Sequence, residues 1–205
     1  MFVQIIQGRA GEPDELREAF DQWYRDLAPD ARGWLGTTAG MTPEGEFIGL
    51  ARFESADAAK RNSQRPEQHQ WWVETSKLFA GDVQFTDCTN VVTFLAGGSD
   101  EAGFVQVLQG EVRDTTRSRE LIRELERLKE FRPELIGGID AVHPDGRHFT
   151  QSCYFTSEAE AREGEQKELP PELAQTMMEG QEIYRDIRYF DLTEPWLYSP
   201  AEKHA

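Results

Sequence analysis

Short apolar runs made of β-prone residues recur along this chain, and two of them are nearly the same. Residues 2–8 read FVQIIQG and residues 104–110 read FVQVLQG, so the runs differ only by exchanges among Ile, Val and Leu. A short apolar run bounded by polar residues is typical of a strand buried on both faces. Its repetition predicts that the chain contains two copies of one structural unit.

The two copies match in further places, and in the same order. TPEGEF at 42–47 aligns with HPDGRH at 143–148, and FESADAAK at 53–60 aligns with FTSEAEAR at 155–162. Pro and Gly stand at equal positions in the first of these pairs, as the turn of a hairpin requires. Equal order at a nearly constant offset indicates a duplication.

Between its first two strands each copy carries apolar residues at helical spacing. In the first copy Leu16, Phe20, Trp23 and Leu27 recur at intervals that place them on one face of a helix. A Ser begins a second helix after the hairpin, and a last strand ends the copy. The predicted order β-α-β-β-α-β is that of a ferredoxin-like α+β unit.

The repeat also sets the expected division of the chain. We predict a first unit over residues 1–97, a linker over 98–102, a second unit over 103–200 and a tail over 201–205. A four-stranded sheet with both helices on one face leaves its other face bare, and burying apolar surface stabilises by about 25 cal/mol per Å². The two units are therefore expected to pack sheet to sheet within one chain.

This repeated plan resembles the dimeric α/β-barrel superfamily, in particular domains of the antibiotic-biosynthesis-monooxygenase type. The resemblance rests on the opening strands, the Pro-Gly hairpins and the stretch FESADAAKRNSQRPEQHQWW at 53–72. It implies two ferredoxin-like units that form one barrel, which relatives build from two chains. A monomer with an internal pseudo-dimer is the expected state, and a homodimer of the whole chain is the alternative.

The charge of the chain narrows the choice of partners. The 38 acidic and 22 basic residues give a net charge of −16 over 205 residues, and such a field repels phosphate backbones and anionic lipid headgroups. We therefore expect neither nucleic acid nor a membrane as a partner. The first residues do not follow the signal-peptide pattern, and the two cysteines follow no metal or redox spacing, so we expect a cytoplasmic protein.

Candidate binding residues gather in the stretch RNSQRPEQHQWW at 61–72, whose counterpart in the second copy has no His, Asn or Trp. This asymmetry favours a ligand pocket in the first copy, between its helices and its sheet. Trp rings stack on flat conjugated molecules, although such residues more often fill a core. The predicted binding residues for a small aromatic molecule are Trp71, Trp72, Arg61, Arg65, Trp34 and Tyr24.

The resemblance further implies a reaction. Some relatives oxidise polycyclic phenols with dioxygen and without metal or flavin, so no cofactor is expected. Such a site needs a base with a pKa near neutrality, which His69 would supply, while Asn62 would polarise a ring oxygen. His69 and Asn62 are the predicted catalytic residues of a monooxygenase-like protein.

Two other functions remain open at this point. One is a non-catalytic barrel that binds a small ligand or is associated with stress. The other is heme binding or degradation, for which His69 lies at the position that the resemblance implies, although such relatives use an Asn where this chain has Gln4 or Gln7. His143 and His148 flank a turn without a carboxylate in their pattern, and we predict no metal site.

Overall fold

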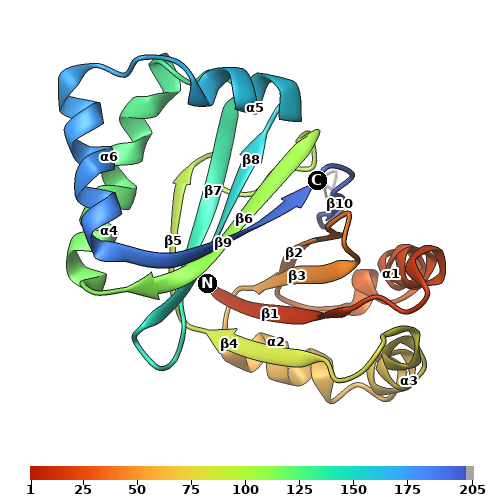
Figure 1. Cartoon of the computed structure of the whole chain (residues 1–205). Helices are drawn as coiled ribbons and strands as arrows, with labels where there is room; N and C mark the ends of the chain where they lie inside the picture. The colour runs from red at the N-terminus through yellow and green to blue at the C-terminus, as the bar shows by residue number, and fades with distance from the viewer. Residues whose placement is uncertain (202–205) are drawn as a thin grey trace. The chain divides into compact units, whose positions relative to one another are not determined.

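The computed structural model describes residues 1–201, and these residues form two units. Unit 1 consists of residues 1–89 and 196–201, and unit 2 consists of residues 90–195. Residues 202–205 of the predicted tail lie outside the described residues. Each unit has one five-stranded antiparallel sheet with helices on one of its faces (Figure 1). The α+β class and the duplicated ferredoxin-like plan are thereby confirmed.

The sheet of unit 1 has the strand order β10-β2-β3-β1-β4. Its strands are β1 (Phe2–Arg9), β2 (Trp34–Met41), β3 (Glu46–Phe53), β4 (Gln84–Cys88) and β10 (Trp196–Tyr198). The helices of this unit are α1 (Pro13–Asp26), α2 (Ala56–Ser63) and α3 (Pro66–Thr75). Pro at the first helical position and acidic residues in the first turn favour the start of α1.

The sheet of unit 2 has the strand order β5-β7-β8-β6-β9. Its strands are β5 (Asn90–Leu95), β6 (Phe104–Val112), β7 (Leu135–Val142), β8 (His148–Phe155) and β9 (Tyr184–Leu192). Its helices are α4 (Thr115–Glu124), α5 (Glu158–Glu165) and α6 (Pro171–Ile183). Among residues 1–201, no helix is long and apolar enough to cross a membrane.

The duplication extends to single hydrogen bonds. Nε2 of Gln4 donates to Oδ1 of Asp87 over 2.9 Å in unit 1, and Nε2 of Gln106 donates to Oδ1 of Asp191 over 2.9 Å in unit 2. Both bonds join the first strand of a copy to its edge strand. The same polar pair has therefore been kept at the same place in both sheets.

Each sheet takes its fifth strand from the part of the chain that the repeat assigns to the other copy. Residues 90–95 were expected in the first unit, but as β5 they pair with β7 of unit 2. In the same way, β10 pairs with β2 of unit 1, where the blue strand lies beside the orange one in Figure 1. Each exchanged strand covers a sheet edge that would otherwise be unpaired.

The structure therefore divides the chain differently from the prediction. The boundary lies between Thr89 and Asn90, while residues 96–103 form an irregular segment inside unit 2. The repeat could not reveal this, because strand pairing across the chain is not visible in local similarity. The expected sheet-to-sheet packing of the two units remains a prediction.

The helix-side cores of the two units differ in composition. In unit 1 this core is largely aromatic, and the ring of Phe47 lies 5.4 Å from Phe20, 5.2 Å from Phe79 and 5.8 Å from Trp196 between centroids. In unit 2 the corresponding core contains mainly Leu, Ile and Phe. This difference decides where each unit has free space.

Candidate functional site

Three of the predicted site residues meet at a small cavity of unit 1. Trp34 from β2, Asn62 from α2 and Trp71 from α3 line it together, and its volume is about 60 Å³. A cavity that takes up benzene measures about 150 Å³, whereas one water needs about 10–15 Å³. The cavity of unit 1 therefore has room for water but not for an aromatic ring.

Asn62 is 7% exposed, and its amide is bonded inside the protein. Nδ2 of Asn62 donates to Oε1 of Gln68 over 3.2 Å, and Oδ1 accepts from Nη1 of Arg65 over 3.0 Å. The same Gln68 oxygen accepts from Nε1 of Trp23 over 2.6 Å, and Arg65 also donates to the backbone oxygen of Leu27 over 3.1 Å. The Asn62 amide thus links α2 to α3 and, through Gln68, to α1.

Asn62→Leu should lower the free energy of unfolding by about 1–3 kcal/mol, because it removes a buried partner from Gln68 and Arg65. Equilibrium unfolding in urea measures the change. His69→Ala is the control, since an exposed side chain away from special contacts usually changes stability by less than about 0.5 kcal/mol. Equal losses in both variants would contradict the assignment of Asn62 to an internal network.

The remaining predicted residues of unit 1 do not line this cavity. His69 and Arg61 are exposed. The ring of Trp72 packs against Phe79 and Phe85, and that of Tyr24 packs against Trp34 and Tyr198. The structure does not bring His69 together with Asn62 and Trp71.

The position of His69 has a simple geometric cause. His69 and Trp71 are two residues apart on α3, and at about 3.6 residues per turn such side chains point in nearly opposite directions. Trp71 faces the core, so His69 faces away from it. The same placement leaves a heme in this cavity without the predicted ligand, and the residues of unit 1 do not fit that group.

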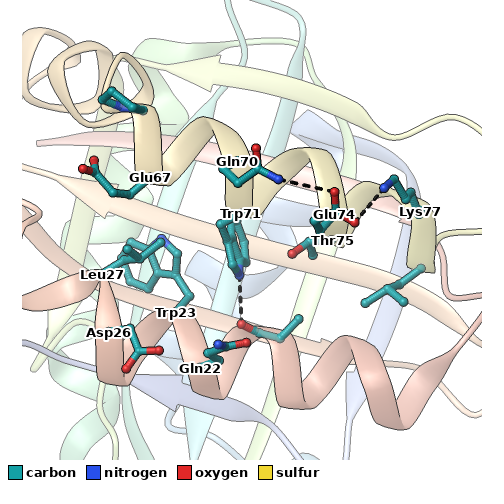
Figure 2. A pocket seen from close by; sticks show the side chains of 13 residues that line it. Gln22, Trp23, Asp26, Leu27, Glu67, Gln70, Trp71, Glu74, Thr75 and Lys77 are labelled. Carbon is teal, nitrogen blue, oxygen red and sulfur yellow. Dashed lines mark hydrogen bonds and ion pairs between the residues drawn. The ribbon is translucent and has the colours of Figure 1, made fainter.

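A second hollow of unit 1 is a groove of about 860 Å³ between α1 and α3 (Figure 2). Trp71 lies across it, and its Nε1 donates to the backbone oxygen of Ala19 over 3.0 Å. The rim carries exposed polar residues, among them Glu74 and Lys77, whose charged groups are 2.6 Å apart. Because its rim is exposed and polar, this groove is an open surface feature.

Unit 2 has a larger cavity than the small one of unit 1, at the equivalent place between helices and sheet. Its volume is about 230 Å³, and side chains from α4, α6, β6, β8 and the start of β9 line it. Most of these side chains are apolar, while Gln151 and Tyr184 place polar groups in the wall. Among the residues that line it are Leu108, Ile122, Leu125, Gln151, Met177 and Tyr184.

This cavity exists because unit 2 has smaller side chains where unit 1 has tryptophans. Equivalent positions of the two units are found by counting residues from the start of each helix. Helices α3 and α6 both begin with Pro, and helices α1 and α4 both follow an N-cap residue. The tryptophan-rich unit has the smaller cavity between its helices and its sheet, and the ligand site predicted in unit 1 stays a prediction. The replaced pairs are Trp23 and Leu125, Trp71 and Thr176, and Trp72 and Met177.

The buried side chains of Ser118 and Asp140 and the half-buried side chain of Tyr184 lie at or near one end of the unit 2 cavity. Oη of Tyr184 is 2.6 Å from Oγ of Ser118. Asp140 on β7 is 2% exposed, and within residues 1–201 its Oδ1 has no hydrogen-bond partner. Burial raises the pKa of Asp140 to about 7, although the positive charge of Arg119 opposes part of this rise.

Tyr184 stays protonated at neutral pH. Burial, and then the negative charge of Asp140, raise the pKa of Tyr184 above its ordinary value, while the hydrogen bond with Ser118 lowers it. Sequence reasoning missed these three residues. A signal was present for one of them, because Asp140 is the only charged residue in the apolar strand LIGGIDAV.

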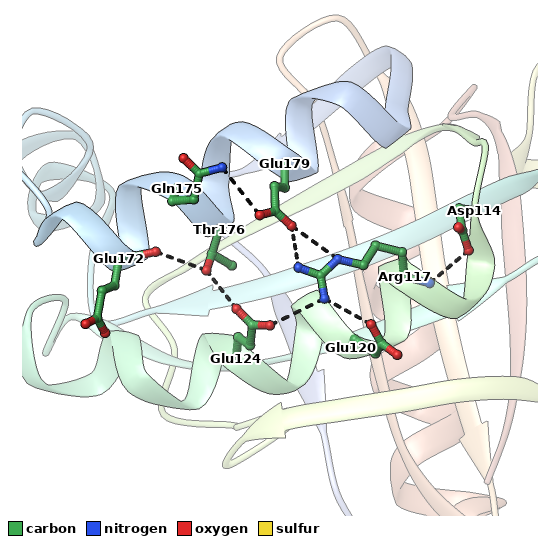
Figure 3. A network of polar contacts seen from close by, with 8 residues as sticks. All are labelled: Asp114, Arg117, Glu120, Glu124, Glu172, Gln175, Thr176 and Glu179. Atoms are coloured by element: carbon green, nitrogen blue, oxygen red, sulfur yellow. Dashed lines mark hydrogen bonds and ion pairs between the residues drawn. The ribbon is translucent and has the colours of Figure 1, made fainter.

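A network of ion pairs joins α4 to α6 beside the cavity (Figure 3). The guanidinium of Arg117 contacts Glu120 and Glu124 on its own helix and Glu179 on α6. Glu124 also accepts from Oγ1 of Thr176 over 2.7 Å, and Thr176 lines the cavity. The network therefore holds one wall of the cavity, although partly exposed pairs of this kind contribute little stability.

Within residues 1–201, no group of three or more His, Cys, Asp or Glu side chains is arranged to hold a metal ion. Nε2 of His143 lies 2.8 Å from Oγ1 of Thr150, and Nδ1 of His148 lies 2.5 Å from Oδ2 of Asp145. The two rings are 6.1 Å apart between centroids. Each of these histidines thus has a partner within its own hairpin.

Comparison with known proteins identifies similar folds and no similar sequences. No family model and no curated protein matches the chain. A candidate monooxygenase from Lactobacillus acidophilus is 14% identical with a TM-score of 0.75, covering 97% of this chain and 95% of its own. An anthrone oxidase-like protein is 7% identical with a TM-score of 0.64, covering 100% and 96%.

A third solved structure is also similar to this chain. It is a ferredoxin-fold protein from Listeria monocytogenes related to antibiotic biosynthesis monooxygenases, 9% identical with a TM-score of 0.50, covering 94% of this chain and 95% of its own. The chain shares the duplicated ferredoxin-like fold of these proteins. At these identities the likeness establishes the fold alone, because one fold can carry many different functions.

Proposed function

We propose that the protein binds a small aromatic molecule in the cavity of unit 2 and oxidises it with dioxygen. The observation that carries this proposal is the cavity of about 230 Å³ at the place that tryptophans fill in unit 1. An apolar cavity of about 150 Å³ takes up benzene, so this one suits a single substituted ring or a compact pair of fused rings. Apolar walls with a few polar groups are typical of small-molecule sites.

The oxidation is supported by the names of two structural neighbours. One is a candidate monooxygenase, and the other is an anthrone oxidase-like protein. In the proposed reaction a ring CH₂ group becomes C=O. One oxygen atom of O₂ enters the product, the other leaves as water, and the substrate supplies all four electrons. The protein binds the ring, excludes water and takes the proton whose loss makes the substrate a reductant.

Met177→Trp should weaken binding of 1-naphthol or phenol at least about tenfold, because it restores the ring that unit 1 has at this position and fills the cavity. Calorimetric titration measures the affinity. Met178→Trp is the matched control, since Met178 is 60% exposed and does not line the cavity. Equal affinities in the native protein and Met177→Trp would place the ligand elsewhere and overturn the proposal.

Turnover is measured separately with an oxygen electrode and 2-indanone, a fused-ring compound that carries the activated ring CH₂ groups which the proposed reaction oxidises. Oxygen consumption that Met177→Trp abolishes and Met178→Trp retains is the expected result. Saturable binding in this cavity without any oxygen consumption would contradict the oxidation and leave a non-catalytic ligand-binding protein.

A further inference from the structure

We infer that Ser118, Asp140 and Tyr184 form a polar subsite of the unit 2 cavity that selects ligands with an acidic hydroxyl group and accepts the proton of that hydroxyl. This inference rests on the proposed binding site in unit 2. It adds the chemical class of the ligand and the group that receives its proton.

The three residues differ in polarity from the residues at the equivalent positions of unit 1. Ser118 corresponds to Leu16 in the helix that follows the opening strand, and both are buried. Asp140 corresponds to Ala39, because each pairs with the exchanged strand of its own sheet, at Val92 and Trp196 respectively. Tyr184 corresponds to Phe79, thirteen residues after the Pro that begins the preceding helix.

Unit 1 thus builds the same fold with three apolar side chains at these positions. Burying a hydroxyl or a carboxyl costs free energy unless the group is hydrogen-bonded, and a carboxylate costs the most. The polar versions in unit 2 are therefore not required by the fold. The carboxyl group of Asp140, whose Oδ1 has no hydrogen-bond partner among the described residues, is costly to it. Three such replacements in one neighbourhood are typical of a functional site.

Asp140 lies in line with residues that form one wall of the cavity. In the sheet of unit 2, Asp140 pairs with Gln151, Gln151 with Leu108, and Leu108 with Tyr189. The last three of these line the cavity, so Asp140 is the next residue of the same cross-strand row on the same face. A ligand that lies along this row brings its polar end towards Oδ1 of Asp140, which has no hydrogen-bond partner among residues 1–201.

The carboxyl group of Asp140 lies in an electrostatic environment that raises its pKa. The ionisable groups that act on Asp140 are Arg119 on α4, Cys153 on β8 and Tyr184 on β9. The guanidinium of Arg119 contacts Oδ1 of Asn90, and no ion pair neutralises Asp140 among the described residues. Asp140 is consequently a base of near-neutral pKa, the range suited to general base catalysis.

The roles of the three residues follow from their chemistry. The hydroxyl O–H bond of the ligand breaks, its proton moves to a carboxylate oxygen of Asp140, and the electron pair stays on the ligand oxygen. The protonated hydroxyl of Tyr184, which lines the cavity, donates a hydrogen bond to the resulting oxyanion. Ser118 holds the Tyr184 hydroxyl in place over 2.6 Å. A ligand hydroxyl with a pKa near that of Asp140 shares the proton best.

The test uses 4-nitrophenol, whose ionised form absorbs visible light, and 4-nitroanisole, which has the same ring without the hydroxyl. The native protein should bind 4-nitrophenol at least about tenfold more tightly. At pH 7, where about half of the Asp140 carboxyl groups are ionised, the bound 4-nitrophenol should show a larger phenolate band than the free ligand. Asp140→Asn should lose that band, and Tyr184→Phe should weaken the binding of 4-nitrophenol more than that of 4-nitroanisole. Met178→Trp, outside the cavity, should leave the binding of both ligands unchanged.

The outcomes separate this inference from the proposed function. If the native protein binds both ligands equally, or if Asp140→Asn keeps the phenolate band, the polar subsite is refuted while the cavity stands. If neither ligand binds in the native protein, the proposed binding site fails and the subsite with it. Asp140→Asn removes a buried charge and is expected to fold, so a lost band reports the carboxylate and not unfolding.

Discussion

Trp196→Ala should lower the free energy of unfolding by about 3–5 kcal/mol, the usual range for truncating a buried aromatic side chain to Ala. Trp196 is buried, and its ring lies 5.7 Å from Phe20 and 5.8 Å from Phe47 between centroids. Although it stands close to the end of the chain, it packs in the core of unit 1 through the pairing of β10 with β2. The loss should therefore appear in the N-terminal part of the chain.

Hydrogen exchange followed by mass spectrometry distinguishes the location. Protection should fall in β2, which pairs with β10, while β9, which directly precedes it along the chain, should keep its protection. Val92→Ala is the matched control at the equivalent position of unit 2 and should cost about 1–2 kcal/mol, because it removes fewer buried carbons. Loss of protection in β9 with β2 unchanged would show that the exchanged strand is assigned to the wrong sheet.

The free energy of unfolding of Asp140→Asn, relative to that of the native protein, should be about 4 kcal/mol higher at pH 8 than at pH 4. Burial raises the pKa of Asp140 from its ordinary 3.8 to about 7 in the folded state. Below pH 4 both states bind the proton, and the carboxyl costs nothing extra. Between pH 4 and 7 the unfolded state releases the proton that the folded state keeps, so the free energy of unfolding falls as pH rises and levels off above 7.

Urea unfolding at a series of pH values measures this difference between the native protein and Asp140→Asn. Asp145→Asn is the control, because hydrogen bonds from His148 and Arg147 lower the pKa of the Asp145 carboxyl. The Asp145 carboxylate stabilises the folded state above the pKa of the unfolded state, and this stabilisation is lost as pH falls. Its pH dependence therefore has the opposite sign to that of Asp140. The effect is small because Asp145 is exposed to solvent. A stability difference for Asp140→Asn that does not change between pH 4 and 8 would show that Asp140 is ionised with a partner in the folded state.

A cost of this size at neutral pH also bears on function. Unit 1 avoids it with Ala39, which is fully buried at the equivalent position. Retention of a costly carboxyl in only one of two copies fits a division of labour, in which unit 1 stabilises the chain and unit 2 binds the ligand. The aromatic core of unit 1 and the cavity of unit 2 are consistent with this division.

Much of the fold could be predicted from the sequence because it depends on local pattern. The two opening strands and the helix face of Leu16, Phe20 and Trp23 follow from period and composition. The hairpin turns follow from Pro and Gly, and Gly45 and Gly146 indeed adopt φ values of +80° and +67°, a region that glycine enters without strain. These features require only neighbours along the chain.

The candidate site was harder to predict because it depends on contacts between distant segments. The repeated local pattern is enough to predict two ferredoxin-like copies whose second helices differ in aromatic content. The packing of Trp71 and Trp72 in unit 1, the exchange of β5 and β10 between the sheets, and the position of Asp140 beside a cavity all depend on contacts between distant segments. The physical reason is that the hydrophobic pattern along the chain determines which face of a helix or strand a side chain occupies. The volume left between a helix and a sheet depends instead on every residue that packs there.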